Sequence, residues 1–298
     1  MNSPAKQQKY PLISVVIPAF NRLPELERAI KSVLLQTFQD FEVIVVDDGS
    51  DEDVKSVCDT FGDGRIRYFR GPRKNANAAR NRGIKEAKGV YIAMLDADDE
   101  FLPDHLKLRV EKMKKDGCDG IFGSALVYDG SVEKVKRSRP LNPGESMADY
   151  LLTDGFCPTP SHFYRTEAAR EIEWDEDLFR NQDYDFSIRF ADRSVFICDP
   201  RSTVRIHWEK GHKKKLTDIH FRSQRRFVEK HRSRISKGAL VNYLYSMKKE
   251  AAEIGNQEQM DYYKKELIKI SPGFGWLILL LKVKMKAFIR KMNSRGQP

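Results

Sequence analysis

The sequence predicts an α/β fold, with a mostly parallel sheet flanked by helices and a helical C-terminal extension. Two observations support this. Between residues 13 and 115, short β-branched runs such as ISVVIP and FEVIVVD are apolar at nearly every position, as in strands covered on both faces. Each run is followed by a segment with apolar residues at helical spacing. This alternation is typical of a Rossmann-like parallel sheet.

The N-terminal part therefore contains four strands, each followed by a helix. Ser50, with Asp53 three residues later, resembles a capping box that would start the second helix. The predicted strands are 13–18, 41–47, 66–69 and 90–95, and the predicted helices are 24–36, 51–61, 77–88 and 104–115.

The pattern is looser after Cys118. A strand at 120–130 is followed by a polar, hairpin-like stretch, and residues 156–165 are expected to form a loop. From 217 to 270 the sequence is helical and strongly charged. The other elements expected here are helices at 146–154, 166–173 and 185–193 and strands at 195–200 and 202–208.

The composition indicates a globular chain that needs no covalent staples. Its 298 residues are enough to bury a core. Four cysteines lie far apart without a C-x-x-C pair, which favours a reducing, cytosolic location. The N-terminus, MNSPAKQQKYP, has no long apolar run, so no secretory signal is expected there.

Positive charge is concentrated in the C-terminal half. The net charge is +10, residues 205–237 are rich in Lys and Arg, and residues 273–298 have six basic residues and no acidic one. Such a surface suits an anionic partner, which could be nucleic acid, a phosphorylated ligand or an anionic membrane. The alternative is an ordinary solvated face.

Aspartates follow the predicted strands at the edge where parallel sheets bind ligands. We expect five carboxylates to face one cleft: Asp47, Asp48, Asp96, Asp98 and Asp99. Each loop alone could be a turn or a helix cap. Together the carboxylates would repel one another unless a cation shares the space, and Mg²⁺ and Mn²⁺ prefer such oxygen ligands.

The phosphate that would accompany this cation is not bound by a glycine-rich loop. Neither the G-x-G-x-x-G pattern nor the P-loop pattern follows the first strand. We therefore expect a diphosphate to be held by the metal and by basic side chains.

Several motifs occur together in a characteristic order: IPAFNR, VIVVDDGS, NANAARNRGIKEAKGVYIAMLDADDEFLPD and QDYDFSIR. In this order and spacing the chain, from about residue 11 to 207, resembles family 2 glycosyltransferases, which have the GT-A fold. The resemblance implies inverting transfer of a sugar from a nucleoside-diphosphate sugar, usually UDP-linked, with Mn²⁺ or Mg²⁺.

The resemblance also implies roles for individual residues. Asp183 would be the general base, with Gln182 in place of the commoner glutamate. Asp98 would ligate the metal; His207 is a second candidate ligand, although a lone histidine is more often structural. Without the family match, Asp183 would be a simple helix cap. The nucleotide-sugar would contact Pro18, Ala19, Asn21, Asp47, Asp48, Asn77, Arg80 and Asp96, and the acceptor would lie near Ser161 and His162.

The predicted organisation follows from this comparison. Residues 1–210 would form the catalytic domain, with a donor half at about 11–118 and an acceptor half at about 119–210, and residues 211–298 a basic helical region. The Q-x-x-R-W motif of processive synthases does not follow Asp183. Addition of a single sugar to a saccharide or lipid-linked saccharide, in cell-surface polysaccharide biosynthesis, is therefore favoured.

The tail at 273–292 has an apolar run of only about nine residues, too short to cross a bilayer. As a helix it would be amphipathic, which predicts peripheral binding to an anionic membrane from the cytoplasmic side, with Trp276 at the interface. Alternatively, it packs on the protein's own core. The apolar face would comprise Ile278, Leu281, Met285, Phe288, Ile289 and Met292, and the basic residues would be Lys282, Lys284, Lys286, Arg290 and Lys291.

Two other classes of function stay open. A sugar-phosphate nucleotidyltransferase would need a glycine-rich basic loop after the first strand, which PAFNRLPE lacks. A nucleotide-sugar or nucleic-acid binding protein without transferase activity is the other alternative. The basic segment 205–237 lacks interleaved aromatic residues for base stacking, so no nucleic-acid partner is expected.

Overall fold

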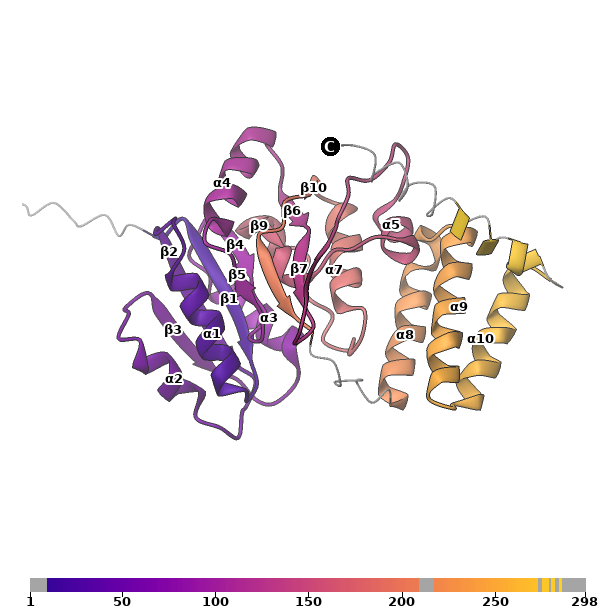
Figure 1. The fold of residues 1–298 in the computed structure, drawn as a ribbon, viewed down its shortest axis with the longest axis horizontal. Helices are drawn as coiled ribbons and strands as arrows, with labels where there is room; N and C mark the ends of the chain where they lie inside the picture. The colour runs from indigo at the N-terminus through magenta and orange to yellow at the C-terminus, as the bar shows by residue number, and fades with distance from the viewer. Residues whose placement is uncertain (1–9, 209–216, 273–274, 279, 282–283, 286–298) are drawn as a thin grey trace, which may run out of the picture. The chain divides into compact units, whose positions relative to one another are not determined.

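A seven-stranded sheet forms the centre of the N-terminal part of the chain (Figure 1). The strand order is β10-β6-β9-β4-β1-β2-β3, and every neighbouring pair is parallel except the two that involve β9. The predicted α/β fold with a mostly parallel sheet is confirmed. The strands are β1 (Ile13–Ala19), β2 (Phe41–Asp47), β3 (Ile66–Arg70), β4 (Tyr91–Met94), β6 (Gly120–Gly123), β9 (Phe163–Arg165) and β10 (Phe196–Asp199). The structure, a computed structural model, describes residues 10–208, 217–272, 275–278, 280–281 and 284–285.

The two central strands are buried along their whole length, which explains their continuous apolar sequence. β1 and β2 pair in register from Ile13 with Phe41 to Ala19 with Asp47, so the two strands end level. The loops that follow them therefore start side by side at the carboxyl edge of the sheet.

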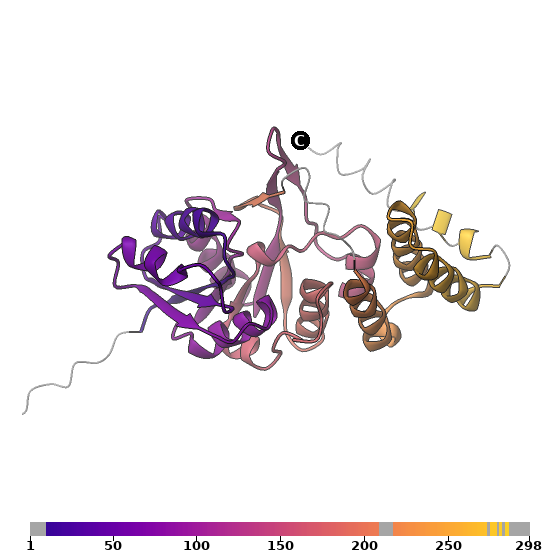
Figure 2. The same cartoon turned by 90° about the horizontal axis from the view of Figure 1, so that it is seen from below.

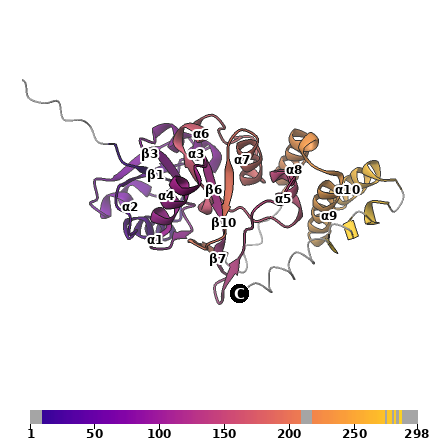
Figure 3. The same ribbon diagram turned by 90° about the horizontal axis from the view of Figure 1, so that it is seen from above.

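Helices cover both faces of this sheet. In Figure 3, α3 and α6 lie on one side of the strands and α1 and α2 on the other. α3 packs so closely on β1 that a Cβ at Gly83 would lie 2.3 Å from Val16 Cγ1. The helices are α1 (Leu23–Leu34), α2 (Val54–Thr60), α3 (Ala76–Glu86), α4 (His105–Asp116) and α6 (Thr166–Arg170).

A second sheet of four strands has the order β5-β11-β7-β8. The predicted single strand at 120–130 is in fact two strands, because the chain leaves the first sheet at β6 and joins the second as β7. Ser124, between them, is fully buried and its Oγ accepts a hydrogen bond from the Ser138 backbone N–H. The strands are β5 (Glu100–Phe101), β7 (Ala125–Tyr128), β8 (Glu133–Lys136) and β11 (Val204–His207).

The chain divides into two compact units. The first contains both sheets, and the second combines Leu141–Phe156 and Asp177–Ile188 with the C-terminal helices. The prediction differs from this division, because it places residues 141–156 and 177–188 in the catalytic domain, 1–210, together with the sheets. The helices of the second unit are α5 (Met147–Thr153), the first turns of α7 (Gln182–Ala191), α8 (Asp218–His231), α9 (Lys237–Glu253) and α10 (Gln257–Ile270) (Figure 2).

Two local predictions were wrong. Asp53, and not Ser50, caps α2, since the Asp53 side chain accepts the Ser56 backbone N–H. The expected loop at 156–165 contains a 3₁₀ turn, Thr159–Ser161, and β9, which lies inside the sheet between β6 and β4. Three residues are too few to show a strand periodicity.

Most apolar residues in the described part of the tail are exposed. Ile278, Leu281 and Met285 are 57–62% exposed, whereas Leu280 is buried. No helix among the described residues is both long and apolar enough to cross a membrane. The remaining predicted tail residues lie outside the described part: Lys282, Lys286, Phe288, Ile289, Arg290, Lys291 and Met292.

Candidate active site

The loop after β1 is joined to the loop after β2 by Asn21. Its Oδ1 accepts hydrogen bonds from the backbone N–H groups of Asp51, at 2.9 Å, and Glu52, at 3.3 Å. Asn21 and Arg22 both have left-handed backbone conformations, with φ of 53° and 57°, which is uncommon outside glycine. Strained residues of this kind concentrate at functional sites. Pro18 and Ala19 lie buried at the end of β1, directly before this turn.

The two aspartates of DDGS have different environments. Asp47 is fully buried: its carboxylate accepts the Tyr68 hydroxyl at 2.8 Å and is 3.2 Å from the Arg70 guanidinium. Asp48 accepts the Lys74 backbone N–H at 2.9 Å. Burial raises the pKa of Asp48 although backbone hydrogen bonds oppose it. Asp48 is 9% exposed and Asp47 is fully buried, so Asp48 is the more accessible of the two carboxylates.

Sequence reasoning missed an aromatic residue beside this carboxylate. Phe20 is 36% exposed, and the Arg73 guanidinium lies 4.5 Å from the centre of its ring. Arg73 is 3.5 Å from Asp51. A flat ring with a cation above it can stack on a nucleotide base. The aromatic letter in PAFNR was the available signal, but the pairing with Arg73 depends on the tertiary fold.

Helix α3 brings three predicted residues into one hydrogen-bonded chain. Asn77 Oδ1 accepts Arg80 at 3.0 Å, and Arg80 donates to Asp96 at 2.7 Å. The Arg80 guanidinium also lies 4.7 Å from the Trp174 ring, and Asn77 donates to the Asp175 carbonyl. Asp96 is therefore oriented by a buried arginine.

The loop after β4 separates its remaining acids. Asp98 is 40% exposed and lies 2.6 Å from the Arg22 guanidinium. Burial and the neighbouring Asp96 raise the pKa of Asp98 nevertheless. Asp99 is buried and accepts the His207 backbone N–H at 2.9 Å, and burial raises its pKa well above the usual value.

The expectation that five carboxylates face one cleft is therefore too simple. Asp47 and Asp99 are engaged in hydrogen bonds that tie them to β3 and β11 respectively. The carboxylates of Asp48, Asp96 and Asp98 have remaining capacity to accept a ligand or a cation. Repulsion is reduced because Arg80 and Arg22 are paired with the last two.

The fit to a divalent cation depends on Asp98 and Asp96. Within the described ranges, no three His, Cys, Asp or Glu residues are grouped closely enough to hold a metal by themselves. Magnesium and manganese sites of phosphate-transfer chemistry commonly use one or two carboxylates plus substrate phosphates, so two hard oxygen donors fit this pattern. His207 Nε2 lies 2.6 Å from Glu100 Oε1, so in this structure the predicted second ligand is paired with a carboxylate.

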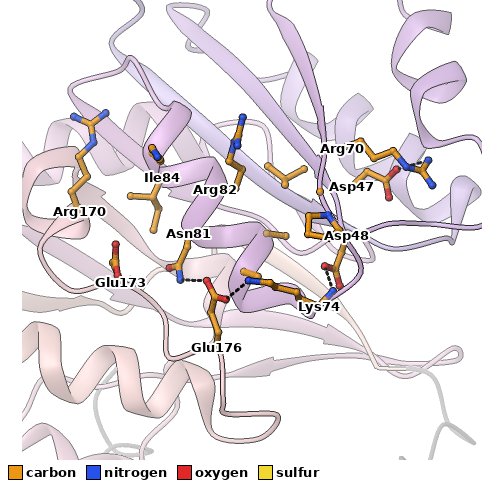
Figure 4. Close-up of a pocket in the computed structure, with 16 residues that line it drawn as sticks. Asp47, Asp48, Arg70, Lys74, Asn81, Arg82, Ile84, Arg170, Glu173 and Glu176 are labelled. Carbon is orange, nitrogen blue, oxygen red and sulfur yellow. Dashed lines mark hydrogen bonds and ion pairs between the residues drawn. The ribbon is translucent and has the colours of Figure 1, made fainter.

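A pocket of about 590 Å³ opens between the ends of β2 and β3, α3 and the segment after α6 (Figure 4). Asp47 and Asp48 line one end, and Arg170 and Glu173 the other. Glu176 accepts hydrogen bonds from Lys74 and Asn81 along one side. Of the described residues predicted to bind nucleotide-sugar, Asp47 and Asp48 are the ones that line it; Pro18, Ala19, Asn21, Asn77, Arg80 and Asp96 do not.

Asp183 belongs to the second unit, in the first turn of α7. Its Oδ1 accepts the Tyr184 backbone N–H at 3.0 Å. Acidic side chains are favoured in the first turn of a helix, where Asp183 lies.

The predicted acceptor residues Ser161 and His162 are both fully buried. Ser161 Oγ donates to the Pro158 carbonyl, and His162 Nε2 lies 3.1 Å from Cys157 Sγ. Burial lowers the pKa of His162 to about 3, so its imidazole is neutral. In this structure neither side chain is available to an acceptor, and both instead fix the loop before β9.

Comparisons with known proteins agree with this geometry. Residues 14–178 match the model of glycosyl transferase family 2. The chain is 34% identical over 196 residues to the amylovoran biosynthesis glycosyltransferase AmsB of Erwinia amylovora, covering 61% of this chain and 64% of that protein. It is 39% identical over 194 residues to the GalNAc(5)-diNAcBac-PP-undecaprenol beta-1,3-glucosyltransferase of Campylobacter jejuni, covering 63% and 62%. The chain thus spans less than two thirds of either relative's length.

Among solved structures, S. aureus TarS 1-349 in complex with UDP-GlcNAc is similar, with a TM-score of 0.58 and 15% identity over 80% of both chains. A second TarS structure gives a TM-score of 0.61 and 17% identity, covering 78% of this chain and 42% of TarS. These likenesses support the GT-A fold. The family match covers more than half of the sequence, so this chain belongs to glycosyl transferase family 2 and carries that family's glycosyltransferase domain.

Proposed function

We propose that the protein is an inverting, metal-dependent glycosyltransferase. It moves one sugar from a nucleoside-diphosphate sugar, with UDP as the expected nucleotide, to a hydroxyl of a saccharide or lipid-linked saccharide in cell-surface polysaccharide biosynthesis. The observation that carries the proposal is the loop after β4, where Asp96 and Asp98 lie together opposite Arg80 and Arg22. Such a loop suits a diphosphate that arrives with a cation.

The activities for which similar proteins are named support the choice of substrates. One relative is named for amylovoran biosynthesis and another for a glucosyltransferase acting on a PP-undecaprenol compound. TarS has been crystallised with UDP-GlcNAc and with UDP. A UDP-sugar donor and a lipid-linked acceptor are therefore the substrates that we propose for this chain.

The proposed mechanism assigns each group one task. Asp48, which also accepts the Lys74 backbone N–H, would accept a hydrogen bond from the nucleotide base. The Phe20 ring, which packs against the Arg73 guanidinium, would stack on the nucleotide base. Asp98, with Asp96, would hold Mn²⁺ or Mg²⁺, which stabilises the charge that develops on the departing diphosphate. Asp183 takes the proton of the acceptor hydroxyl. The acceptor oxygen attacks the anomeric carbon from the face opposite the diphosphate, and the bond to the diphosphate breaks. The configuration at the anomeric carbon is therefore inverted.

Removal of the metal tests the proposed role of the cation in donor binding and UDP release. UDP release is measured with UDP-glucose, UDP-galactose, UDP-GlcNAc and UDP-GalNAc, using octyl glycosides as acceptors. We expect EDTA to abolish release and Mn²⁺ or Mg²⁺ to restore it, and we expect Asp98→Asn to raise the metal concentration required for half-maximal rate by about 10-fold or more, in line with losses seen when metal-site groups are changed.

Asp59→Asn is the matched control, because Asp59 is also an exposed aspartate paired with a cation, Lys55, but lies on α2. It should leave the metal requirement unchanged. Full turnover in EDTA, or an Asp98→Asn variant with the same metal requirement as Asp59→Asn, would contradict the proposed metal site.

We also propose that the tail binds the anionic inner face of the cell membrane, which would make this a cytoplasmic, peripheral enzyme. Leu277, Ile278, Leu281 and Met285 are exposed, and Lys284 is exposed beside them. Apolar residues beside basic ones on a surface helix suit a membrane that carries negative charge. The Trp276 ring lies 6.1 Å from the Tyr245 ring, which connects the tail to α9.

Vesicle flotation checks the tail. We expect the protein to float with phosphatidylglycerol-containing vesicles at low salt, to float less at high salt, and to stay at the bottom with phosphatidylcholine alone. Ile278→Glu should abolish flotation, whereas Ile254→Glu should not, since Ile254 is similarly exposed, at 47%, but follows α9. Equal flotation of both variants would contradict the tail as the binding element.

A further inference from the structure

The short segment that leads into α7 is held in an unusual backbone conformation by α9. Asn181, directly before the helix, has a left-handed φ of 61°. Its side-chain Oδ1 accepts a hydrogen bond of 2.8 Å from the hydroxyl of Tyr243, which is buried on α9. Asn181 is two residues before Asp183. The backbone turn that starts the helix of the proposed base is thus held in place by a residue of the C-terminal helices.

The backbone of the two residues before Asn181 is held by a side chain of α8. The N–H groups of Phe179 and Arg180 both donate to Ser223 Oγ at 3.0 Å, and Ser223 Oγ donates to the Arg180 carbonyl at 3.1 Å. The Arg180 side chain in turn reaches both carboxylate oxygens of Glu250, at 2.8 and 2.7 Å. Both contacts come from Arg180 Nη2, and hydrogen bonds between charged groups are stronger than those between neutral ones.

A third contact holds α7 on the other side of the proposed base. Asp185, two residues after Asp183, is fully buried. Its Oδ1 lies 2.7 Å from His231 Nε2 and 2.8 Å from Lys230 Nζ, both at the C-terminal end of α8. The helix is therefore restrained immediately before and immediately after Asp183 by side chains of α8 and α9.

We propose that α8 and α9 position Asp183 for proton abstraction, with Tyr243 and His231 as the positioning residues. The inference rests on the proposed function, in which Asp183 is the base. Neither residue needs to touch a substrate for this role. A base must lie within hydrogen-bond reach of the acceptor hydroxyl, and a displacement of about 1 Å can cost on the order of 10²-fold in rate. The basic helical region is then part of the catalytic machinery, in addition to any role at a membrane.

Tyr243→Phe tests the first contact, and the chain contains a matched control. Tyr263, on α10, is also buried, and its hydroxyl donates to Gln224 Oε1 of α8 at 2.7 Å rather than to Asn181. Both Phe variants lose one buried hydroxyl bond. We expect Tyr243→Phe to lower kcat by about 10- to 100-fold with little change in donor or acceptor KM, and Tyr263→Phe to leave kcat close to that of the wild type. The assay is UDP release from the most active UDP-sugar of the panel above.

His231 gives a second, independent test. His231→Gln keeps an N–H donor for Asp185, whereas His231→Leu removes it. We expect the Leu variant to lose kcat and the Gln variant to regain most of it. Equal kcat in Tyr243→Phe and Tyr263→Phe together with equal kcat in the two His231 variants would overturn the inference, as would losses confined to KM.

The same assay distinguishes an error in the assignment of Asp183 as the base from an error in the positioning role. If Asp183→Asn kept the wild-type kcat in the same assay, Asp183 would not be the base, and any effect of Tyr243→Phe would have another origin. An inactive Asp183→Asn beside a fully active Tyr243→Phe and His231→Leu would leave the base in place and reject the positioning role alone.

Discussion

Asp183→Asn is expected to lower kcat for sugar transfer by about 10²- to 10⁴-fold, the usual contribution of a general base. The amide has the same shape as the carboxylate but cannot take a proton from the acceptor hydroxyl. Donor binding should change little, because the proposed role of Asp183 is to take a proton from the acceptor and the amide keeps the size of the carboxylate. UDP release at saturating donor, together with donor KM, measures this.

Asp218→Asn is the control for the loss of a helix-terminal charge. Asp218 is exposed and, like Asp183, lies in the first turn of a helix of the second unit. Either substitution removes a favourable interaction with the helix dipole that is typically about 0.3–1 kcal/mol. The two variants should therefore have similar melting temperatures, and Asp183→Asn alone should be inactive. A residual rate near the wild-type value would remove Asp183 from the mechanism.

No other carboxylate on α7 is as well suited to this role. Asp185, one half-turn further, is fully buried and lies within 2.8 Å of both Lys230 and His231. The carboxylate of Asp185 is thus held inside the protein by side chains of α8. Of the two aspartates of α7, we therefore propose Asp183, which matches the motif, as the base.

The elements that sequence could predict are those whose signal is local. β1 and β2 are apolar at every buried position, and α1 has buried Leu26, Ala29, Ile30 and Val33 at helical spacing. Because parallel strands end at one edge of the sheet, the aspartates after β2 and β4 could be placed together without coordinates. Helix ends were off by a few residues where caps compete, as with Ser50 and Asp53.

What sequence could not predict depends on contacts between distant segments. Asp99 and Asp98 are neighbours, yet one is buried against β11 and the other is exposed beside Arg22, which nothing in DADDE distinguishes. The loop residues Ser161 and His162 were predicted to lie near the acceptor, but the 3₁₀ turn and β9 place both side chains in the core. The stacking of Arg73 on Phe20 joins residues from two loops.

A buried ion pair between α4 and β10, at the edge of the seven-stranded sheet, is expected to contribute strongly to the stability of the first unit. Arg109 on α4 is fully buried and its Nη1 lies 2.9 Å from the carboxylate of Asp199 at the end of β10. Burial by itself would raise the pKa of Asp199, but Arg201 and Arg109 outweigh it and lower that pKa. Burial also lowers the pKa of Arg109 to about 10. Both groups are thus charged at neutral pH and depend on each other.

Asp199→Ala is expected to lower the free energy of unfolding by about 3–5 kcal/mol, because it leaves the Arg109 guanidinium buried without its counter-charge. Arg201→Ala removes the other cation from Asp199, but Arg201 is 44% exposed, so this variant should cost about 1 kcal/mol or less. Chemical denaturation followed by circular dichroism gives both values. An Asp199→Ala variant no less stable than Arg201→Ala would show that Arg109 does not need this partner.

The sign of the pH dependence gives an independent check on the same pair. Since the pKa of Asp199 is lower in the folded state than its ordinary value of 3.8, its contribution is present above that value and is lost as the pH falls through the lowered one. Asp199→Ala should therefore flatten the loss of stability in acid as well as lowering stability at neutral pH. Replacing both partners, Arg109→Met with Asp199→Ala, removes the unpaired charge and should recover much of the lost stability. Such a recovery would show that Asp199 stabilises the folded protein mainly by neutralising the buried charge of Arg109.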